Sequence, residues 1–482
     1  MSLSGALSNA MSGLTANARG TTVVSSNIAN ALNEHYGRRD LVLSANATQS
    51  SGGVNIAGVE RSFDPILAHH KRHAIASHAS ATVAAKFGND LEQLVGSVDT
   101  ARSLSDRLTR LETALISAAS DPSSETRLRN ISHSAEAFSA DLRAASHGID
   151  TLRANADAQI ATFVDALNSG LSQLEQLNSQ IMIATHLGQD VHGLMDQRDA
   201  TLDILSEIVP VRVVQRESGV VAIFTTQGRT LLDDTAATFS FVPSPTTMPH
   251  MTVANGLLSR LQIDGNEIDI PGSGRMTGGA LEAQFLLRDK NAPAAQERLD
   301  AIAREAVELF GPGGPDPTLG PGDAGTFTDA GSAFLPTDQT GLAGRITLNS
   351  ALAASSGEIW RWRDGINASV QGDVGESNLL LALRDQVVVP KLPASGILGD
   401  APRGLVDHVQ EMSNGAAATR VRSSEILDTA SAQLNHARQA VAVDGVNTDQ
   451  ELQKLIELEK SYAANARVVQ VVDDMLSELL KI

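Results

Sequence analysis

Four histidines lie close together in the stretch AHHKRHAIASH, and histidine is a common zinc ligand. The four are His69, His70, His73 and His78. His69 and His73 are one helical turn apart, a spacing that can bind zinc. No HExxH motif is present, and the spacing places no third ligand. Because Lys71 and Arg72 add positive charge, the pattern favours a solvated basic face over a metal site.

Two further patterns resemble parts of enzyme sites. GSGRMTGG, residues 272–279, is glycine-rich, but it lacks both G-x-G-x-x-G spacing and a P-loop lysine, so a flexible turn is favoured. The pairs Asp264-Gly265 and Asp444-Gly445 lack the ligand series of a calcium loop. No G-x-S-x-G nucleophile elbow occurs.

The segment DQRD places Asp196 and Asp199 near Arg198 on an expected helix. We interpret these residues as surface ion pairs or an interdomain contact rather than as acid–base catalysts. The sequence therefore predicts no enzyme, no catalytic residue, no cofactor and no metal ligand.

Composition narrows the class further. The chain has 482 residues, 42% hydrophobic and only 3% aromatic, which predicts several domains with aliphatic, alanine-rich cores. A net charge of −19 argues against binding nucleic acid. The absence of cysteine excludes disulfides and thiolate sites. No apolar stretch is long enough for a membrane helix, and residues 1–14 do not resemble a secretory signal peptide.

Hydrophobic periodicity predicts mostly helix with one β-rich region. Helices are expected over 2–32, 66–118, 123–147, 151–186, 192–208, 279–310, 403–442 and 450–480. A short hairpin is expected within 37–67 and ends at Pro65, and Asp121-Pro122 is expected to start a helix. Period-two alternation predicts strands in 209–275, with Asp-Gly as the turn of LQIDGNEIDI. Residues 311–325 are a Gly/Pro loop, and 326–395 are mixed.

The first and last helices share an unusual pattern. Each has a narrow apolar seam with asparagine on or beside it, as in Asn27, Asn30 and Asn465. A narrow seam is typical of a coiled coil, and a seam asparagine fixes register at a cost in stability. We expect the two helices to pair, and to pack on other copies. Gly5, Gly13 and Gly20 weaken the first helix in isolation.

Both ends resemble the bacterial flagellar axial proteins of rod, hook and hook-associated structures. Leu14-Thr15-Ala16, SSNIAN and Tyr36-Gly37-Arg38-Arg39 are similar to their N-terminal signature, and GVNTDQELQKLIELEKSYAANARVVQVVDDMLSELLKI to their C-terminal one. GGVNIAGVERSFDPIL, LMDQRDATLDILSEIV and GGALEAQFLLRD resemble hook-associated members at the hook–filament junction. The usual Asn-Thr-x-Gly-Tyr run is absent at residues 32–37, and 311–395 match nothing in the family.

The resemblance implies a structural protein of the flagellum, outside the cell, exported through the type III channel without a cleaved signal peptide. It implies a homo-oligomeric ring or helical layer that contacts the hook protein and the second junction protein. An export chaperone would hold the C-terminal helix. No nucleic acid and no membrane insertion are expected.

We expect a mostly α fold with terminal coiled-coil helices, a central helical bundle and a small β domain projecting outward. The predicted domains are 1–60 with 441–482 (coiled-coil assembly), 61–208 with 279–310 and 395–440 (helical bundle), 209–278 (β-rich outer module) and 311–394 (loop and mixed segment). The expected assembly interface comprises Leu3, Leu7, Leu14, Val24, Asn27, Ile28, Asn30, Leu452, Leu455, Leu458, Tyr462, Asn465, Val469, Val472, Leu476 and Leu479.

Other functions remain open at this stage. A hook or rod protein belongs to the same class, although the DQRD segment argues against it. A type III-secreted effector or adhesin with flagellar-type ends, and a secreted metal-binding enzyme on the same export frame, belong to other classes.

Overall fold

The computed structural model describes residues 3–45, 52–96, 103–270 and 276–479, and these form two compact units. Unit 1 comprises residues 1–77, 168–237 and 431–482, and unit 2 comprises 78–167 and 238–430. Three helices contribute residues to both units: α2 (Pro65–Val95), α4 (Glu125–His186) and α10 (Leu405–Val443). The mostly helical fold class is confirmed, whereas the predicted domain limits stay a prediction.

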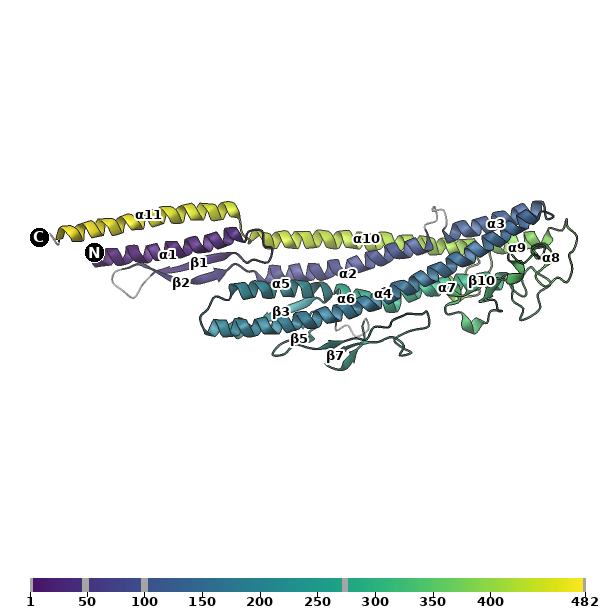
Figure 1. The fold of residues 1–482 in the computed structure, drawn as a ribbon, viewed down its shortest axis with the longest axis horizontal. Coiled ribbons are helices and arrows are strands. Elements are labelled where there is room, and N and C mark those ends of the chain that lie inside the picture. Colours follow the sequence, from purple (N-terminus) through teal and green to yellow (C-terminus); the bar gives the residue numbers. More distant parts are fainter. Residues whose placement is uncertain (1–2, 46–51, 97–102, 271–275, 480–482) are drawn as a thin grey trace. The chain divides into compact units, whose positions relative to one another are not determined.

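Unit 1 contains the two ends of the described chain. Its complete elements are α1 (Leu3–Ala29), β1 (Arg39–Ala45), β2 (Val54–Arg61), α5 (His192–Ile208), β3 (Val211–Gln215), β4 (Val221–Thr225), β5 (Thr230–Leu232) and α11 (Thr448–Leu479). α1 and α11 lie side by side (Figure 1). The predicted hairpin is confirmed: β1 and β2 pair antiparallel, with Arg39 opposite Arg61, and they pack against α1.

The C-terminal part of α4 supports the three-stranded sheet β3–β4–β5 within unit 1. Its predicted apolar stripe is buried at Leu171, Leu174 and Ile181. Asn178 interrupts this stripe and is itself buried, because its amide exchanges two hydrogen bonds with the backbone of Val221, at 2.8 and 3.2 Å. A polar residue in the stripe thus ties the helix to the first residue of β4.

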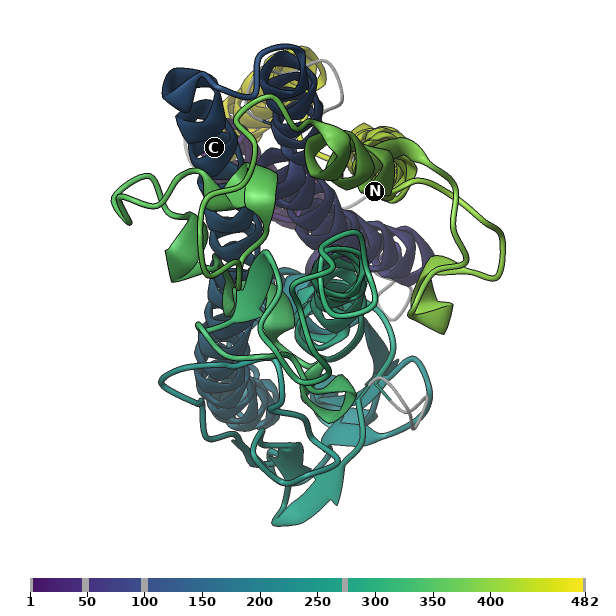
Figure 2. The same cartoon turned by 90° about the vertical axis from the view of Figure 1, so that its right-hand side faces the viewer.

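Unit 2 holds a large aliphatic core. Its elements are α3 (Leu104–Ser120), β6 (Phe239–Ser240), β7 (Leu261–Ile263), β8 (Asn266–Ile268), α6 (Gly279–Leu286), a π-helical turn (Leu287–Asn291), α7 (Ala292–Leu309), β9 (Phe327–Asp329), β10 (Ile346–Leu348), α8 (Arg361–Asp364) and α9 (Asn378–Val388). Phe327 contacts Phe138 and Phe310 edge to face at the centre of this core. The irregular segment between α7 and α10 faces the viewer in Figure 2.

The RD pair of GGALEAQFLLRD is part of a buried polar network in unit 2. The guanidinium of Arg288 is fully buried, with Asp157 at 2.6 Å and Asp289 at 2.8 Å. Arg153 donates to the carbonyls of Met248 and Met251, at 2.9 and 2.6 Å. These bonds hold the loop that follows β6 against α4, and a buried arginine needs this number of acceptors to offset its desolvation.

Several predicted boundaries were wrong. The helix expected over 66–118 is two helices, α2 and α3; Ser103 caps α3 by accepting from the amide of Asp106. The helices expected over 123–147 and 151–186 form one continuous helix, α4. Gly148 does not end it, and the absence of a side chain there leaves room for Leu94, which packs against this position. Asp121 ends α3 and does not start α4.

The β-rich region is also divided differently. β3–β5 and β6–β8 form separate three-stranded sheets that fall in different units. The predicted β7–β8 hairpin is confirmed, since Asp264 and Gly265 both have positive φ (53° and 77°), as a tight two-residue turn requires. Part of GSGRMTGG lies outside the described residues.

A buried histidine predicts a pH effect on the stability of unit 2. His408 on α10 is 2% exposed, and neither ring nitrogen has a hydrogen-bond partner among the residues that the structure describes. Burial lowers the pKa of His408, and the charge of Arg403 acts in the same direction. The unfolded chain therefore takes up this proton first as the pH falls below about 6.5, which destabilises the folded state.

We predict that His408→Leu narrows the difference in the free energy of unfolding between pH 8 and pH 5.5, measured by urea denaturation. His436→Leu, an exposed position on the same helix, is the matched control and leaves that difference unchanged. An equal effect of both substitutions would show that the buried imidazole is not the source.

Candidate assembly site

α1 and α11 form an antiparallel pair in which glycines of α1 receive side chains of α11. A Cβ on Gly13 would lie 2.7 Å from the amide nitrogen of Asn465, and one on Gly20 would lie 3.0 Å from a methyl of Leu458. Asn17 donates to Ser461 at 3.0 Å. Gly13 and Gly20 are seven residues apart on α1, and their partners Asn465 and Leu458 are seven residues apart in the opposite direction on α11. The seam therefore has a heptad register.

Asn27, the next position in this heptad, is fully buried and uses its whole hydrogen-bonding capacity. Its Nδ2 donates to the carbonyl of Arg39 at 2.9 Å and to Oε2 of Glu451 at 3.0 Å. Its Oδ1 accepts from the hydroxyl of Tyr36 at 2.9 Å and from the amide of Arg39 at 3.1 Å. One amide thus joins α1, the connection to β1, and the start of α11.

The carboxylates of the DQRD helix form a buried series along one face of α5. Asp196 lies 2.7 Å from Arg61 and accepts from the amide of Gly37. Asp199 pairs with Arg61 at 2.7 Å and with Arg72 at 2.8 Å. Three successive segments, the one before β1, the end of β2 and the start of α2, are therefore fixed to α5.

The series continues one turn further. Asp203 pairs with Arg72 at 2.9 Å and with Lys71 at 2.6 Å, and His35 lies 3.8 Å away. We refer to Asp196, Asp199 and Asp203, with Arg61, Lys71 and Arg72, as the carboxylate ladder. Asp196 also lies 3.5 Å from Arg39, so each carboxylate meets more than one cation, and the ladder satisfies charges that would be expensive to bury alone.

The interpretation of the DQRD charges as surface ion pairs was wrong. Asp196, Arg198 and Asp199 are all buried. Arg198 points away from the ladder and donates to the carbonyl of Gly219 at 2.6 Å, while burial lowers the pKa of its guanidinium. The ion pairs lie within unit 1, and both partners of each come from that unit.

The predicted interface residues fall into three groups. Val24, Asn27 and Val472 are buried. The partly buried residues are Leu3, Leu7, Leu14, Ile28, Asn30, Leu455, Leu458, Asn465 and Val469. The exposed residues are Leu452, Tyr462, Leu476 and Leu479. Asn30 lies just beyond α1, where its amide caps the carbonyl of Ser26 at 2.9 Å rather than facing α11.

Sequence reasoning missed the residues that receive and bind these side chains. Gly13 and Gly20 were read as weak points of α1, whereas they are its contact positions. Glu451 was quoted in the C-terminal signature without a role, and it is fully buried against Asn27. The signal that could have found them is the heptad spacing of Gly13, Gly20 and Asn27, and that of Glu451, Leu458, Asn465 and Val472.

The histidines at the start of α2 do not contribute to this site. His69, His70 and His73 are exposed, and partial burial together with neighbouring cationic groups lowers the pKa of His69. Within residues 3–45, 52–96, 103–270 and 276–479, no three His, Cys, Asp or Glu side chains are grouped so that they could hold a metal. No helix in the same ranges is long and apolar enough to cross a bilayer.

Comparisons with known proteins match both the interior and the C-terminal end. The family model described as the flagellar hook-associated protein FlgK helical domain matches residues 89–310, and that of the flagellar basal body rod FlgEFG protein C-terminal matches 437–482. The chain is 26% identical to flagellar hook-associated protein 1 of Escherichia coli (strain K12), over 100% of both chains. It is 23% identical to flagellar hook-associated protein 1 of Bacillus subtilis (strain 168), over 98% of this chain and 97% of the other.

Among solved structures, the flagellar hook junction protein FlgK from Burkholderia pseudomallei is similar, with 22% identity and a TM-score of 0.43. That match covers 54% of this chain and 46% of the other.

The paired ends and the sequence matches define a non-enzymatic, structural component of the bacterial flagellum. Within that class, the chain is similar to the FlgK hook-associated proteins, both in its helical interior and over its full length.

The glycine contacts predict that α1 tolerates no large side chain at position 20. Gly20→Leu would overlap Leu458, and overpacking costs typically about 1–3 kcal/mol. We therefore expect the fraction of this variant found in purified flagella, relative to the medium, to fall about tenfold.

Leu458→Ala restores space for the new side chain, so the double variant Gly20→Leu/Leu458→Ala should recover incorporation. Normal incorporation of Gly20→Leu alone would contradict the observed register.

The carboxylate ladder predicts a large loss of stability when one carboxylate is neutralised. Asp199→Asn keeps the shape of the side chain but leaves Arg61 and Arg72 short of negative charge. Breaking a buried pair costs on the order of 3 kcal/mol, measured as the free energy of unfolding in urea. Asp190→Asn, at an exposed carboxylate, is the control and should change little; similar losses for both would reject the ladder.

Proposed function

We propose that this chain is a structural subunit of the junction between hook and filament, and that it polymerises there through α1 and α11. The observation that carries the proposal is the α1–α11 pair, whose register is fixed on one side while apolar surface is left open on the other. Its relatives' names, flagellar hook-associated protein 1, support the same place in the flagellum.

The open surface is a stripe along α11. Val468, Val471, Met475 and Leu479 are spaced three and four residues apart, so they share one face of the helix, and all are exposed. A two-helix pair cannot cover such a stripe, and exposed apolar patches mark interaction surfaces. Other copies of the chain supply equivalent helices, so a closed or helical layer of copies would bury it.

The same features suit an exported chain. Glycines at positions 5, 13 and 20 each cost about 1 kcal/mol in an isolated helix, so α1 gains its stability from α11 and from neighbours. Such a chain passes a narrow channel unfolded and folds on assembly. An export chaperone would cover the stripe on α11 beforehand, and the hook protein and the second junction protein would contact the assembled layer outside the cell.

The first test is deletion of the gene, followed by electron microscopy and by probing the medium for flagellin. Bare hooks with flagellin shed into the medium are expected. Normal filaments would reject the junction role and favour an effector or adhesin with flagellar-type ends.

Complementation of the deletion then tests the stripe. Met475→Glu places a charge in the apolar contact and should restore filaments to well under a tenth of the cells, although the chain is still exported. Gln470→Glu, an exposed polar position on the same helix, is the matched control and should restore filaments fully. Equal rescue by both variants would show that the stripe is not an interface.

A further inference from the structure

Two surface features of unit 1 are not used by the terminal helices: a pocket beside the carboxylate ladder and an apolar projection at the C-terminal end of α4. We propose that the pocket of one copy receives the end of α4 from the next copy. This contact rests on the proposed polymerisation and gives it a second, independent interface.

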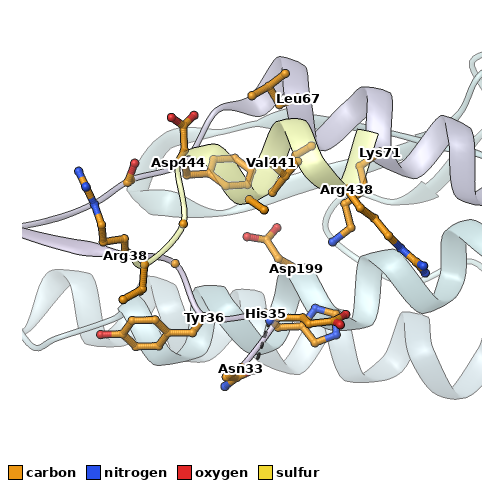
Figure 3. Close-up of a pocket in the computed structure, with 18 of the residues that line it drawn as sticks. Asn33, His35, Tyr36, Arg38, Leu67, Lys71, Asp199, Arg438, Val441 and Asp444 are labelled. Atoms are coloured by element: carbon orange, nitrogen blue, oxygen red, sulfur yellow. Dashed lines mark hydrogen bonds between the residues drawn. The ribbon is translucent and has the colours of Figure 1, made fainter. Parts of the chain in front are cut away.

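The pocket has a volume of about 430 Å³ and lies where the α1–β1 and α10–α11 connections meet. Leu67 and Val441 lie on one side of it, and His35 and Tyr36 on the other (Figure 3). Two exposed aliphatic side chains lie at or next to it: Leu32, which lines the pocket, is 99% exposed, and Val443, between the lining residues Ala442 and Asp444, is 84% exposed. Exposed apolar side chains around a preformed pocket are typical of a protein–protein interface whose partner is absent.

Two carboxylates that line the pocket already have cationic partners. Asp199 and Asp203 on its floor are paired within the carboxylate ladder, so they do not demand a charged ligand. Arg438 lines the pocket from α10, is exposed, and makes no hydrogen bond or ion pair with any residue that the structure describes. The pocket therefore offers aliphatic walls together with the exposed guanidinium of Arg438.

The end of α4 presents the complementary groups. Ile183 and Leu187 are one helical turn apart and are 55% and 66% exposed, so they form a small apolar knob. Asp190 lies three residues beyond Leu187 and is exposed; it accepts from the amide of His192 at 2.9 Å, and the ring of His192 lies 4.0 Å away. Two aliphatic side chains and a nearby exposed carboxylate match the aliphatic walls and Arg438.

The knob and the pocket are complementary, and they are different patches of the same chain. The occupant is therefore a second copy of the chain rather than a small ligand. Contacts between different patches are heterologous, and they propagate head to tail into rings or filaments. A pocket of this volume also accepts branched aliphatic side chains, since cavities of about 300–1,000 Å³ hold small apolar groups. Leu187 of one copy would then lie beside Val443 of the next.

The absence of cysteine from the chain allows a direct test by disulfide formation. Cells lacking the gene would produce two full-length variants together, Leu187→Cys and Val443→Cys, and purified flagella would be oxidised. We expect a dimer of the two variants at least tenfold above the control pair, Leu187→Cys with Val242→Cys, whose second position is exposed but in unit 2. Neither variant alone should give a dimer.

Dimer formation no greater than in the control pair would overturn the contact. It would also be overturned if the Leu187→Cys and Val443→Cys variants formed no disulfide and a chemical crosslinker instead joined the Val443→Cys variant to a protein of different mass. Both variants must be present in the flagella, and this is measured on the same sample. If they are absent, the proposed function fails; if they are present without crosslinking, only the head-to-tail contact fails.

A charge exchange gives an independent readout. Asp190→Arg or Arg438→Asp alone should lower incorporation into flagella about tenfold, and the two together should restore it. Failure of the pair to improve on the single variants would also reject the contact, since both residues are exposed; Asp190→Asn, which removes the charge without reversing it, controls for loss of the hydrogen bond to the amide of His192.

Discussion

The buried amide of Asn27 is the interaction on which the arrangement of unit 1 depends. It binds Tyr36, Arg39 and Glu451 at once, so α1, β1 and α11 can meet in only one way. A leucine in its place would bury more apolar surface, but it would accept neither the amide nor the hydroxyl. The seam thus gives up some stability for a single register, as polar seam residues do in coiled coils.

The carboxylate ladder also fixes the relative positions of its elements, through ion pairs instead of an amide. Arg61 lies at the end of β2 and Arg72 in the second turn of α2, and α5 supplies all three carboxylates that face them. Hydrophobic contacts are non-directional and tolerate sliding, whereas paired guanidinium and carboxylate groups do not. The connections between terminal helices and the remainder of unit 1 are short and polar, which is where directional bonds are most needed.

Periodicity in the sequence was sufficient to predict most of the long helical stretches, the β1–β2 hairpin and the β7–β8 hairpin, because each depends on local spacing or turn chemistry. It did not predict α8 or α9. It failed where distant residues decide the outcome. Gly148 does not end α4, since Leu94 packs against it, and Gly20 is a contact position only because Leu458 lies opposite. The charges of DQRD were assigned to the surface because nothing nearby in sequence reveals that Arg61 and Arg72 bury them.

The partners in the α1–α11 seam are separated by almost the whole chain: Asn27 and Glu451 are 424 residues apart. Closing so long a loop carries an entropic cost that is recovered only when both halves of the seam are present. A chain cut short by faulty synthesis or proteolysis anywhere between them lacks one half, so it cannot form the seam. The seam therefore acts as a test of completeness, because only a chain that carries both ends can form it.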